Sequence, residues 1–203
     1  MRAREIAHVP GRVPDTTAER GSSARQFPGA TTMTTMQKTT ILPPLDPSVP
    51  ARILEEGYGP GAWHGADLRA ALADVAPIAA FWRPGPDRHN IAEIALHHAW
   101  CVRSVIGQLE GSDLPPFPLD GEDWFALSAE GQPLSWREAQ RTLEEQQRRL
   151  AEVVASVGAG GTISPLSERE RFDLVLGVTC HAIYHAGQVQ LIKVLGAASA
   201  RGG

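Results

Sequence analysis

Two histidines, His181 and His185, stand four residues apart in the apolar stretch CHAIYHAGQ. On a helix, residues at this spacing share one face, with Cβ atoms about 6 Å apart. Two imidazoles placed in this way can bind one cation, because metal–nitrogen bonds are about 2.0–2.1 Å long. Buried histidines that are satisfied by hydrogen bonds alone are the alternative. The pair by itself leaves both interpretations open.

A second pair, His97 and His98, lies in the stretch EIALHHAW. Consecutive residues of a helix point about 100° apart, so one of the two can face the axis of a helix bundle. If the two helices lie side by side, one histidine of this pair can meet His181 and His185. Three histidines leave coordination positions open, as catalytic rather than purely structural metal sites do.

Further residues within one turn of the histidines can support such a site. Glu93 can hydrogen-bond a ligand imidazole or accept a proton, or it is simply an acid favoured at a helix N-terminus. Cys101 can approach the metal, or it fills a small space in the core. Gly177 leaves room beside His181, and the amide of Gln188 can orient a ligand.

Four other residues have weaker connections to the site. Tyr184 is expected to pack with its hydroxyl at the rim, and His64 can cap a helix, line a pocket or do neither. Trp124 and Phe125 can roof a pocket, or they anchor their loop through their aromatic rings. We expect no role for two further histidines, His8 and His89.

Apolar periodicity predicts helices over 64–82, 91–111, 135–157 and 168–195. Asn90 can cap the second, Gly111 ends it, and Ser135 with Glu138 forms a capping box for the third. Ser167 with Glu170 does the same for the fourth. A long connection, 111–134, joins the middle two helices, and connections of this length are often functional. The sequence therefore predicts an all-α four-helix bundle.

Residues 1–48 differ from the rest, because they are rich in Thr, Ser, Pro and Gly and show no apolar period. We expect this tail to be disordered and residues 49–197 to form the bundle domain. Met33 and Met36 offer alternative starts to Met1. The hydrophobic content is 42%, enough for one core, and the net charge of −4 does not favour a nucleic-acid partner. With no secretory signal or membrane span expected and only two cysteines, we expect a cytoplasmic protein.

The stretches IAEIALH, ending at His97, and HAIYHAGQV, starting at His181, together resemble the motifs of the DinB-like superfamily. WHGADLRAAL and DWF resemble one branch of it, and the likeness covers roughly residues 50–196. This resemblance implies an up-down-down-up bundle in which His97, His181 and His185 bind one divalent ion: zinc, nickel or ferrous iron. The register of the motif favours His97 over His98, which takes a position that is usually apolar in the family.

The resemblance also implies the chemistry. The first possibility is a metal-dependent transferase that activates a low-molecular-weight thiol toward an electrophilic small molecule. The second is a metal-dependent hydrolase, and the third is a non-catalytic, metal-stabilised stress-response protein that acts through binding. Thiol transfer is preferred, because relatives with an assigned activity favour it. A homodimer through an exposed helix face fits a bundle of this size.

Overall fold

The structure, a computed structural model, describes residues 46, 48–128, 130 and 133–202. Within these residues it is all-helical, with no strand, as the sequence predicts. The predicted tail falls outside the described residues except for Asp46 and Ser48, and so do Met33 and Met36. The helices are α1 (Ser48–Tyr58), α2 (Leu68–Leu72), α3 (Pro77–Ala80), α4 (Ile91–Glu110), α5 (Trp136–Gly158) and α6 (Glu168–Gly202).

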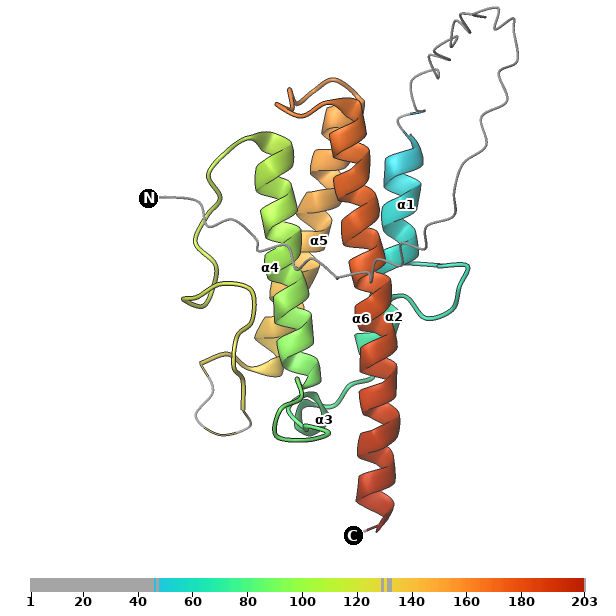
Figure 1. The fold of residues 1–203 in the computed structure, drawn as a ribbon, viewed down its shortest axis with the longest axis vertical. Coiled ribbons are helices and arrows are strands. Elements are labelled where there is room, and N and C mark those ends of the chain that lie inside the picture. The colour runs from blue at the N-terminus through green and yellow to red at the C-terminus, as the bar shows by residue number, and fades with distance from the viewer. Residues whose placement is uncertain (1–45, 47, 129, 131–132, 203) are drawn as a thin grey trace, which may run out of the picture. The chain divides into compact units, whose positions relative to one another are not determined.

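Four of these helices, α1, α4, α5 and α6, form the bundle (Figure 1). The helices α4 and α5 run in the same direction, so the connection between them must return along the full length of the bundle. The helices α1 and α6 run together in the opposite direction. The order is therefore up-down-down-up, and the long 111–135 connection is a consequence of the parallel α4–α5 pair.

The ends of α4 follow from its sequence. The side chain of Asn90 accepts a hydrogen bond from the Glu93 backbone N–H, and the Asn90 backbone N–H donates to the Glu93 carboxylate, which makes a capping box. At the other end Gly111 has a left-handed conformation, with φ 64°, that glycine adopts without strain. These two signals fix where α4 begins and ends, and hence where its histidines lie.

The predicted caps of α5 and α6 are also present. Ser135 and Glu138 form a capping box at the start of α5. The Glu170 backbone donates to the Ser167 hydroxyl, and the Ser167 backbone donates to the Glu170 carboxylate, at the start of α6. The helix α6 continues past the predicted end at 195 to Gly202.

The prediction of one long helix over 64–82 is wrong. Asp67 caps a helix that ends after Leu72, and Pro77 then begins a separate short helix, α3. The residue before a proline is pushed toward extended backbone, and Ala76 has ψ 149°, so one continuous helix cannot form.

The fourth helix of the bundle is instead α1, which the sequence analysis missed. Gly57 lies where α1 contacts α6: a Cβ there would come within 3.0 Å of the Thr179 carbonyl oxygen. The glycine is therefore needed for the two helices to approach this closely.

The core is divided into two clusters along the bundle. One contains the first half of α4, α2, the start of α5 and the 182–192 part of α6. The other contains the second half of α4, the 150–154 part of α5 and the 175–178 part of α6, against which α1 packs. Four histidines of α4 and α6 lie near the boundary between these clusters, so the middle of the bundle is polar: His97, His98, His181 and His185.

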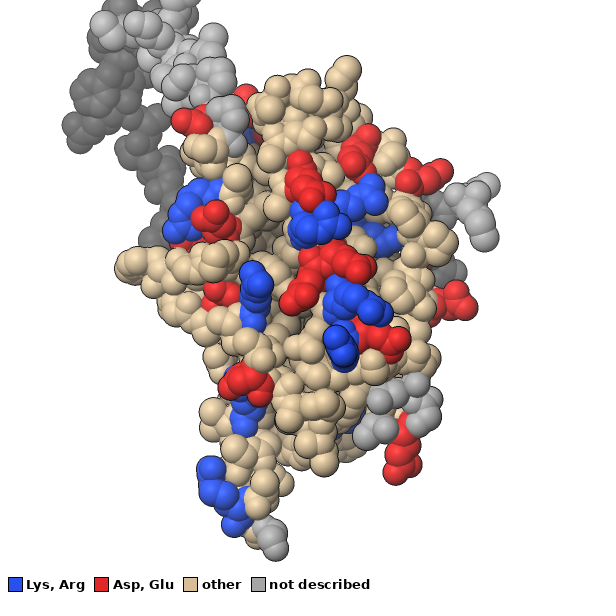
Figure 2. Space-filling view, turned by 180° about the vertical axis from the view of Figure 1, so that it is seen from behind, with Lys and Arg blue, Asp and Glu red and all other residues tan. Residues whose placement is uncertain are grey.

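Charged side chains of both signs are interleaved on the face seen from behind, to which α5 contributes (Figure 2). Arg148 pairs with Glu152 along α5, and Arg149 pairs with Glu110 of α4. The arginines of α5 are thus partly neutralised by nearby carboxylates, as expected of a solvated helix face.

Candidate metal centre

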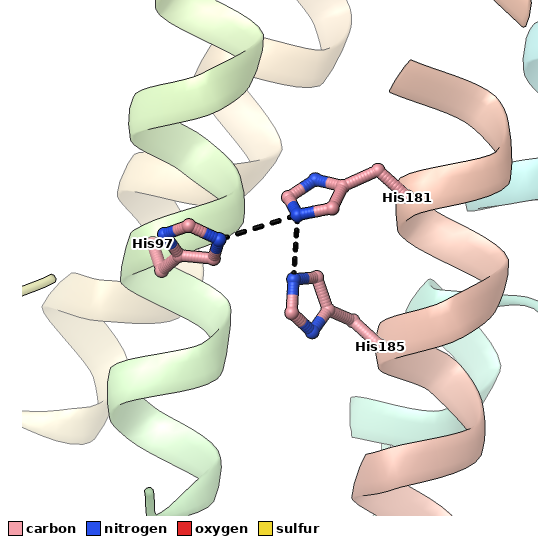
Figure 3. Close-up of side chains that lie close together, drawn as sticks. All are labelled: His97, His181 and His185. Atoms are coloured by element: carbon pink, nitrogen blue, oxygen red, sulfur yellow. Dashed lines mark hydrogen bonds between the residues drawn. The ribbon is translucent and has the colours of Figure 1, made fainter. Parts of the chain in front are cut away.

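Three histidines, His97 of α4 and His181 and His185 of α6, point toward one another (Figure 3). The Nε2 atom of His181 lies 3.2 Å from Nε2 of His97 and 2.8 Å from Nε2 of His185. His97 and His185 are buried, with 6% and 2% of their surface exposed, whereas His181 is half-buried. The arrangement brings the same nitrogen of each ring to one point, and this group could hold a metal ion.

The other ring nitrogen of His97 is held by the long connection. Nδ1–H of His97 donates to the backbone carbonyl of Asp123 at 2.9 Å, and the Asp123 carboxylate lies 3.0 Å from the same nitrogen. Both partners are pure acceptors, so the proton of a neutral His97 resides on Nδ1. Its Nε2 atom then offers a lone pair to the centre of the cluster.

His185 is oriented in the same way from within α6. Its Nδ1–H donates to the Gln188 side-chain oxygen at 2.6 Å. The Gln188 amide nitrogen donates in turn to the Tyr184 hydroxyl at 3.0 Å, which fixes the orientation of the amide. The predicted supporting role of Gln188 thus has a specific contact, and Tyr184, 62% exposed, has its hydroxyl at the rim.

His181 is oriented by the second histidine of the α4 pair. Its Nδ1 atom lies 3.0 Å from Nδ1 of His98, and Nε2 of His98 lies 2.8 Å from the Gln147 amide of α5. His98 is completely buried, and both of its nitrogens are engaged. It therefore supports His181, while His97 presents a nitrogen to the cluster.

The distances fit a divalent ion. Two metal–nitrogen bonds of 2.0–2.1 Å at angles of 90–110° place the nitrogens about 2.8–3.4 Å apart. In the structure, His181 Nε2 is 3.2 Å from Nε2 of His97 and 2.8 Å from Nε2 of His185. Because the Gln147 amide nitrogen donates to Nε2 of His98, a neutral His98 carries its proton on Nδ1 and donates it to Nδ1 of His181. His181 then carries its proton on Nε2 and donates it to Nε2 of His185, and a cation bound by the three rings would displace that proton. Neutral imidazoles of this kind suit zinc, nickel and ferrous iron.

The surroundings favour the neutral imidazoles that a metal requires. Burial, together with the neighbouring His181, lowers the pKa of His185 to about 4. Burial and His97 lower the pKa of His181, and burial holds the pKa of His98 well below its usual range. These rings are therefore unprotonated and able to donate lone pairs at neutral pH.

Trp124 lies flat on His97, with ring centroids 3.8 Å apart and planes at 3°. His89 stacks on the opposite face of Trp124 at 3.7 Å, so the indole is held between two imidazoles. A cavity of about 640 Å³ begins beyond this stack, lined by His89, Trp124 and Arg83 among others. Trp124 thus covers the site, as one of the two predictions for it states, whereas Phe125 is buried in the core.

Glu93 is almost fully buried and ties the long connection to α4. Its carboxylate accepts hydrogen bonds from Arg83 and from the Leu127 backbone, and it pairs with His89. Burial would raise the pKa of Glu93, but the bonds from Arg83, Leu127 and His89 outweigh it and lower the pKa. These contacts give Glu93 a supporting role under Trp124 rather than a contact with the three histidines.

A second group of possible ligands, His97, Cys101 and Asp123, shares His97 with the first. The Cys101 sulfur lies 3.8 Å from His97 Nε2. Burial and the Asp123 charge raise the pKa of Cys101 to about 11, so its thiol is protonated at neutral pH. Cys101 therefore borders the site as a neutral side chain, and both cysteines are free of disulfide bonds.

Two other predictions can be placed. A Cβ at Gly177 would meet nothing within 4 Å, so this exposed glycine borders open space beside His181. His64 donates from Nε2 to the carbonyl of Glu56 at 2.8 Å, so it caps the end of α1 and does not join the site.

The family model of the DinB superfamily matches residues 62–189, more than half of the chain and the part that carries all three histidines. The chain belongs to the DinB superfamily. The match starts after α1, so that helix is an element of this DinB protein outside the matched region. No curated protein and no solved structure gives a significant match.

In this DinB protein, sequence reasoning missed His89, the Asp123 carbonyl and the contact of His98 with Gln147. The sequence did carry a signal for His89: it lies four residues before Glu93, a spacing that predicts a contact between the two side chains. No signal existed for the Asp123 carbonyl, because every residue carries one.

Proposed function

We propose that this DinB protein is a metal-dependent transferase that joins a low-molecular-weight thiol to an electrophilic small molecule. The observation that carries the proposal is the convergence of three Nε2 atoms whose Nδ1 positions are all occupied by other partners. Three neutral donors leave coordination positions for a substrate. A divalent ion bound there lowers the pKa of a thiol or water and so supplies a nucleophile at neutral pH.

The nearby carboxylates favour a thiol over water as nucleophile. Glu93 is engaged with Arg83 and His89, and Asp123 is engaged with His97. Neither is free to act as the general acid or base that protonates the leaving group in ester or amide hydrolysis, whereas a halide displaced by a thiolate leaves without a proton. The resemblance to thiol transferases within the superfamily points the same way.

The residues around the site have separate roles in this proposal. His97, His181 and His185 hold the ion, and Asp123, His98 and Gln188 orient them. Trp124 keeps water from one side of His97. The half-buried His181 is the most exposed of the three ligands and marks the side from which a small substrate can approach.

The subcellular location of the protein is also part of the proposal. No helix among the described residues is long and apolar enough to span a membrane. We place the protein in the cytoplasm, where small thiols are kept reduced and free cysteines such as Cys101 and Cys180 persist.

The test is turnover of a fluorogenic alkyl halide with cysteine or glutathione. A carbon–sulfur bond forms as the carbon–halogen bond breaks, the halide leaves, and the thiol proton passes to solvent. We expect turnover that requires thiol, disappears on chelation and returns with added zinc, nickel or ferrous iron.

The same assay separates the alternatives. Loss of an ester or amide substrate without thiol, sensitive to chelation, would replace the proposal with a hydrolase. Metal binding without chelator-sensitive turnover of either substrate class would favour a non-catalytic stress-response protein. The matched control is His64→Ala, because His64 lies outside the site and its loss should leave turnover unchanged.

A further inference from the structure

The face of α6 that points away from the core is made of small and apolar residues. They recur every three and four residues, which is the heptad spacing by which two helices pair. We name this set the outer stripe. Its members, all exposed, are Gly177, Cys180, Tyr184, Gly187, Leu191, Val194 and Ala198.

The outer stripe is not interrupted by charge. From Leu174 to Ala200 the only charged side chain is Lys193. Lys193 points toward α2, where it contacts the Ala71 carbonyl and the Asp74 carboxylate. Tyr184, Leu191 and Val194 are 62%, 59% and 64% exposed, respectively. A continuous exposed apolar surface of this kind marks an interaction site.

The two ends of the outer stripe carry opposite charges at the same heptad positions. Asp173 lies four residues before Gly177, and Arg201 lies three residues after Ala198. Both are exposed. Parallel pairing of two such helices would place like charges together, whereas antiparallel pairing places Asp173 of each copy against Arg201 of the other.

We propose that the outer stripe binds the outer stripe of a second copy in antiparallel orientation, which makes a symmetric homodimer. Each copy offers the same surface, as an interface with a two-fold axis requires. The charges at the ends select the antiparallel direction, and the apolar residues between them supply the contact.

The charge pairing also sets the register. The midpoint between Asp173 and Arg201 is Gly187, so Gly187 of the two copies meet at the two-fold axis. Among the described residues, a Cβ at Gly187 meets nothing within 4 Å beyond its own stretch of helix, so no packing contact there explains this glycine. Glycine at the axis lets the two backbones approach closely. Tyr184 then lies beside Leu191 of the second copy.

The size of the interface predicts how tight the dimer is. The stripe from Asp173 to Arg201 is about 42 Å long at 1.5 Å per residue, and a helix contact is about 10 Å wide. Each copy therefore buries about 400 Å², or about 800 Å² in total. Stable interfaces bury about 1,200–2,000 Å², so we expect a reversible dimer that dissociates at micromolar concentrations.

Sedimentation of the full chain between about 1 and 200 µM tests this proposal. We expect concentration-dependent dimerisation that Leu191→Lys abolishes while helix content and metal content stay unchanged. Arg137→Asp, an exposed charge reversal on α5, is the matched control and should leave dimerisation as it is. A wild-type chain that stays monomeric, or a Leu191→Lys chain that still dimerises, would overturn the proposal.

Charge exchange tests the direction of pairing. Asp173→Arg and Arg201→Asp should each weaken the dimer about 3–10-fold, and the double variant should restore it, because every end contact is again between opposite charges. Failure of the double variant to regain affinity would refute antiparallel pairing.

Cross-linking tests the register. Gly187→Cys in a Cys180→Ser background should form a disulfide-linked dimer under mild oxidation. The native Cys180 should not, because antiparallel pairing separates the two copies of Cys180 by about 20 Å along the helices. A native Cys180 cross-link with none at Gly187→Cys would indicate the parallel arrangement instead.

Discussion

The two sides of the histidine cluster are formed by different parts of the fold. On one side, the 111–135 connection supplies a carbonyl and an indole to His97. On the other, the packed bundle surrounds His98 and supplies the amide of Gln147. His97 and His98 are neighbours in the chain, yet one has a nitrogen free for the cluster and the other has none. The role of an imidazole here depends on which of its nitrogens already has a partner.

Among the variants considered, removing both ligands of α6 should have the largest effect on metal binding. His181→Ala with His185→Ala leaves only His97 in the cluster, and one imidazole does not retain a divalent ion against chelators. We expect bound metal to fall from about one equivalent to background, measured by elemental analysis.

The same double variant should lose the stabilisation that metal gives. A ligand at 100 times its Kd stabilises the folded state by about 2.7 kcal/mol, which should vanish in thermal unfolding with and without zinc. Undiminished metal content in this variant would place the ion elsewhere.

The two neighbours on α4 should differ when each is replaced. His97→Ala removes a ligand, and metal should be lost. His98→Leu removes only the partner of the His181 Nδ1 atom, so one equivalent should still bind, about 10–100-fold more weakly. Competition with a chromophoric chelator measures both. Complete loss with His98→Leu and retention with His97→Ala would reverse the assignment.

Acid should destabilise the metal-free protein by protonating the buried His185. The pKa of His185 is about 4 in the folded state and 6.5 as its ordinary value, so the unfolded chain binds more protons between these limits. The stabilisation from the neutral ring is complete above pH 6.5 and is lost as the pH falls toward 4. At 1.36 kcal/mol per pKa unit, the loss is up to about 3 kcal/mol.

Urea unfolding between pH 7.5 and 4.5 measures this loss. His185→Leu is the control, because it removes this titrating ring and should reduce the slope over this window; the slope that remains comes from His98 and His181, whose pKa values are also lowered. Equal slopes in the two proteins would assign the acid sensitivity to other groups.

The smallest effect is expected on the loop side. Asp123→Gly removes the carboxylate near His97 but keeps the backbone carbonyl that accepts its hydrogen bond. Glycine also suits the φ of 66° at this position. Metal affinity should weaken less than with His98→Leu, by no more than about 10-fold. A loss as large as that of His97→Ala would mean that the carboxylate, not the carbonyl, orients the ring.

The parts of the fold that sequence predicts well are those with local signals. The start of α4 at Asn90 and its end at Gly111 follow from capping chemistry, as does the start of α5 at Ser135. The 64–82 segment was predicted as one helix from an apolar stripe that ends before Pro77, and the break that this proline imposes was not taken into account. The first bundle helix, α1, was missed because it is short and follows a stretch without any period.

The three histidines could be found because helical spacing and motif bring them together. The supporting contacts were predictable only when they were local. Gln188 is three residues from His185 and was anticipated, whereas Gln147, which contacts His98, is on another helix. The position of the Asp123 carbonyl depends on the path of the 25-residue connection between the end of α4 and the start of α5. Residue types alone do not determine that path. Tertiary contacts therefore had to come from the structure.

The central claim is that His97, His181 and His185 hold one divalent ion through their Nε2 atoms. Imidazole ¹H–¹⁵N correlation spectra of the metal-free and Zn²⁺-loaded protein test it most directly, because the chain has only 7 histidines to assign. The account predicts that at one equivalent these three rings, and no others, show metal-bound Nε2 and a proton on Nδ1. Coordination through Nδ1, by fewer than three of these rings, or by His98 would contradict it.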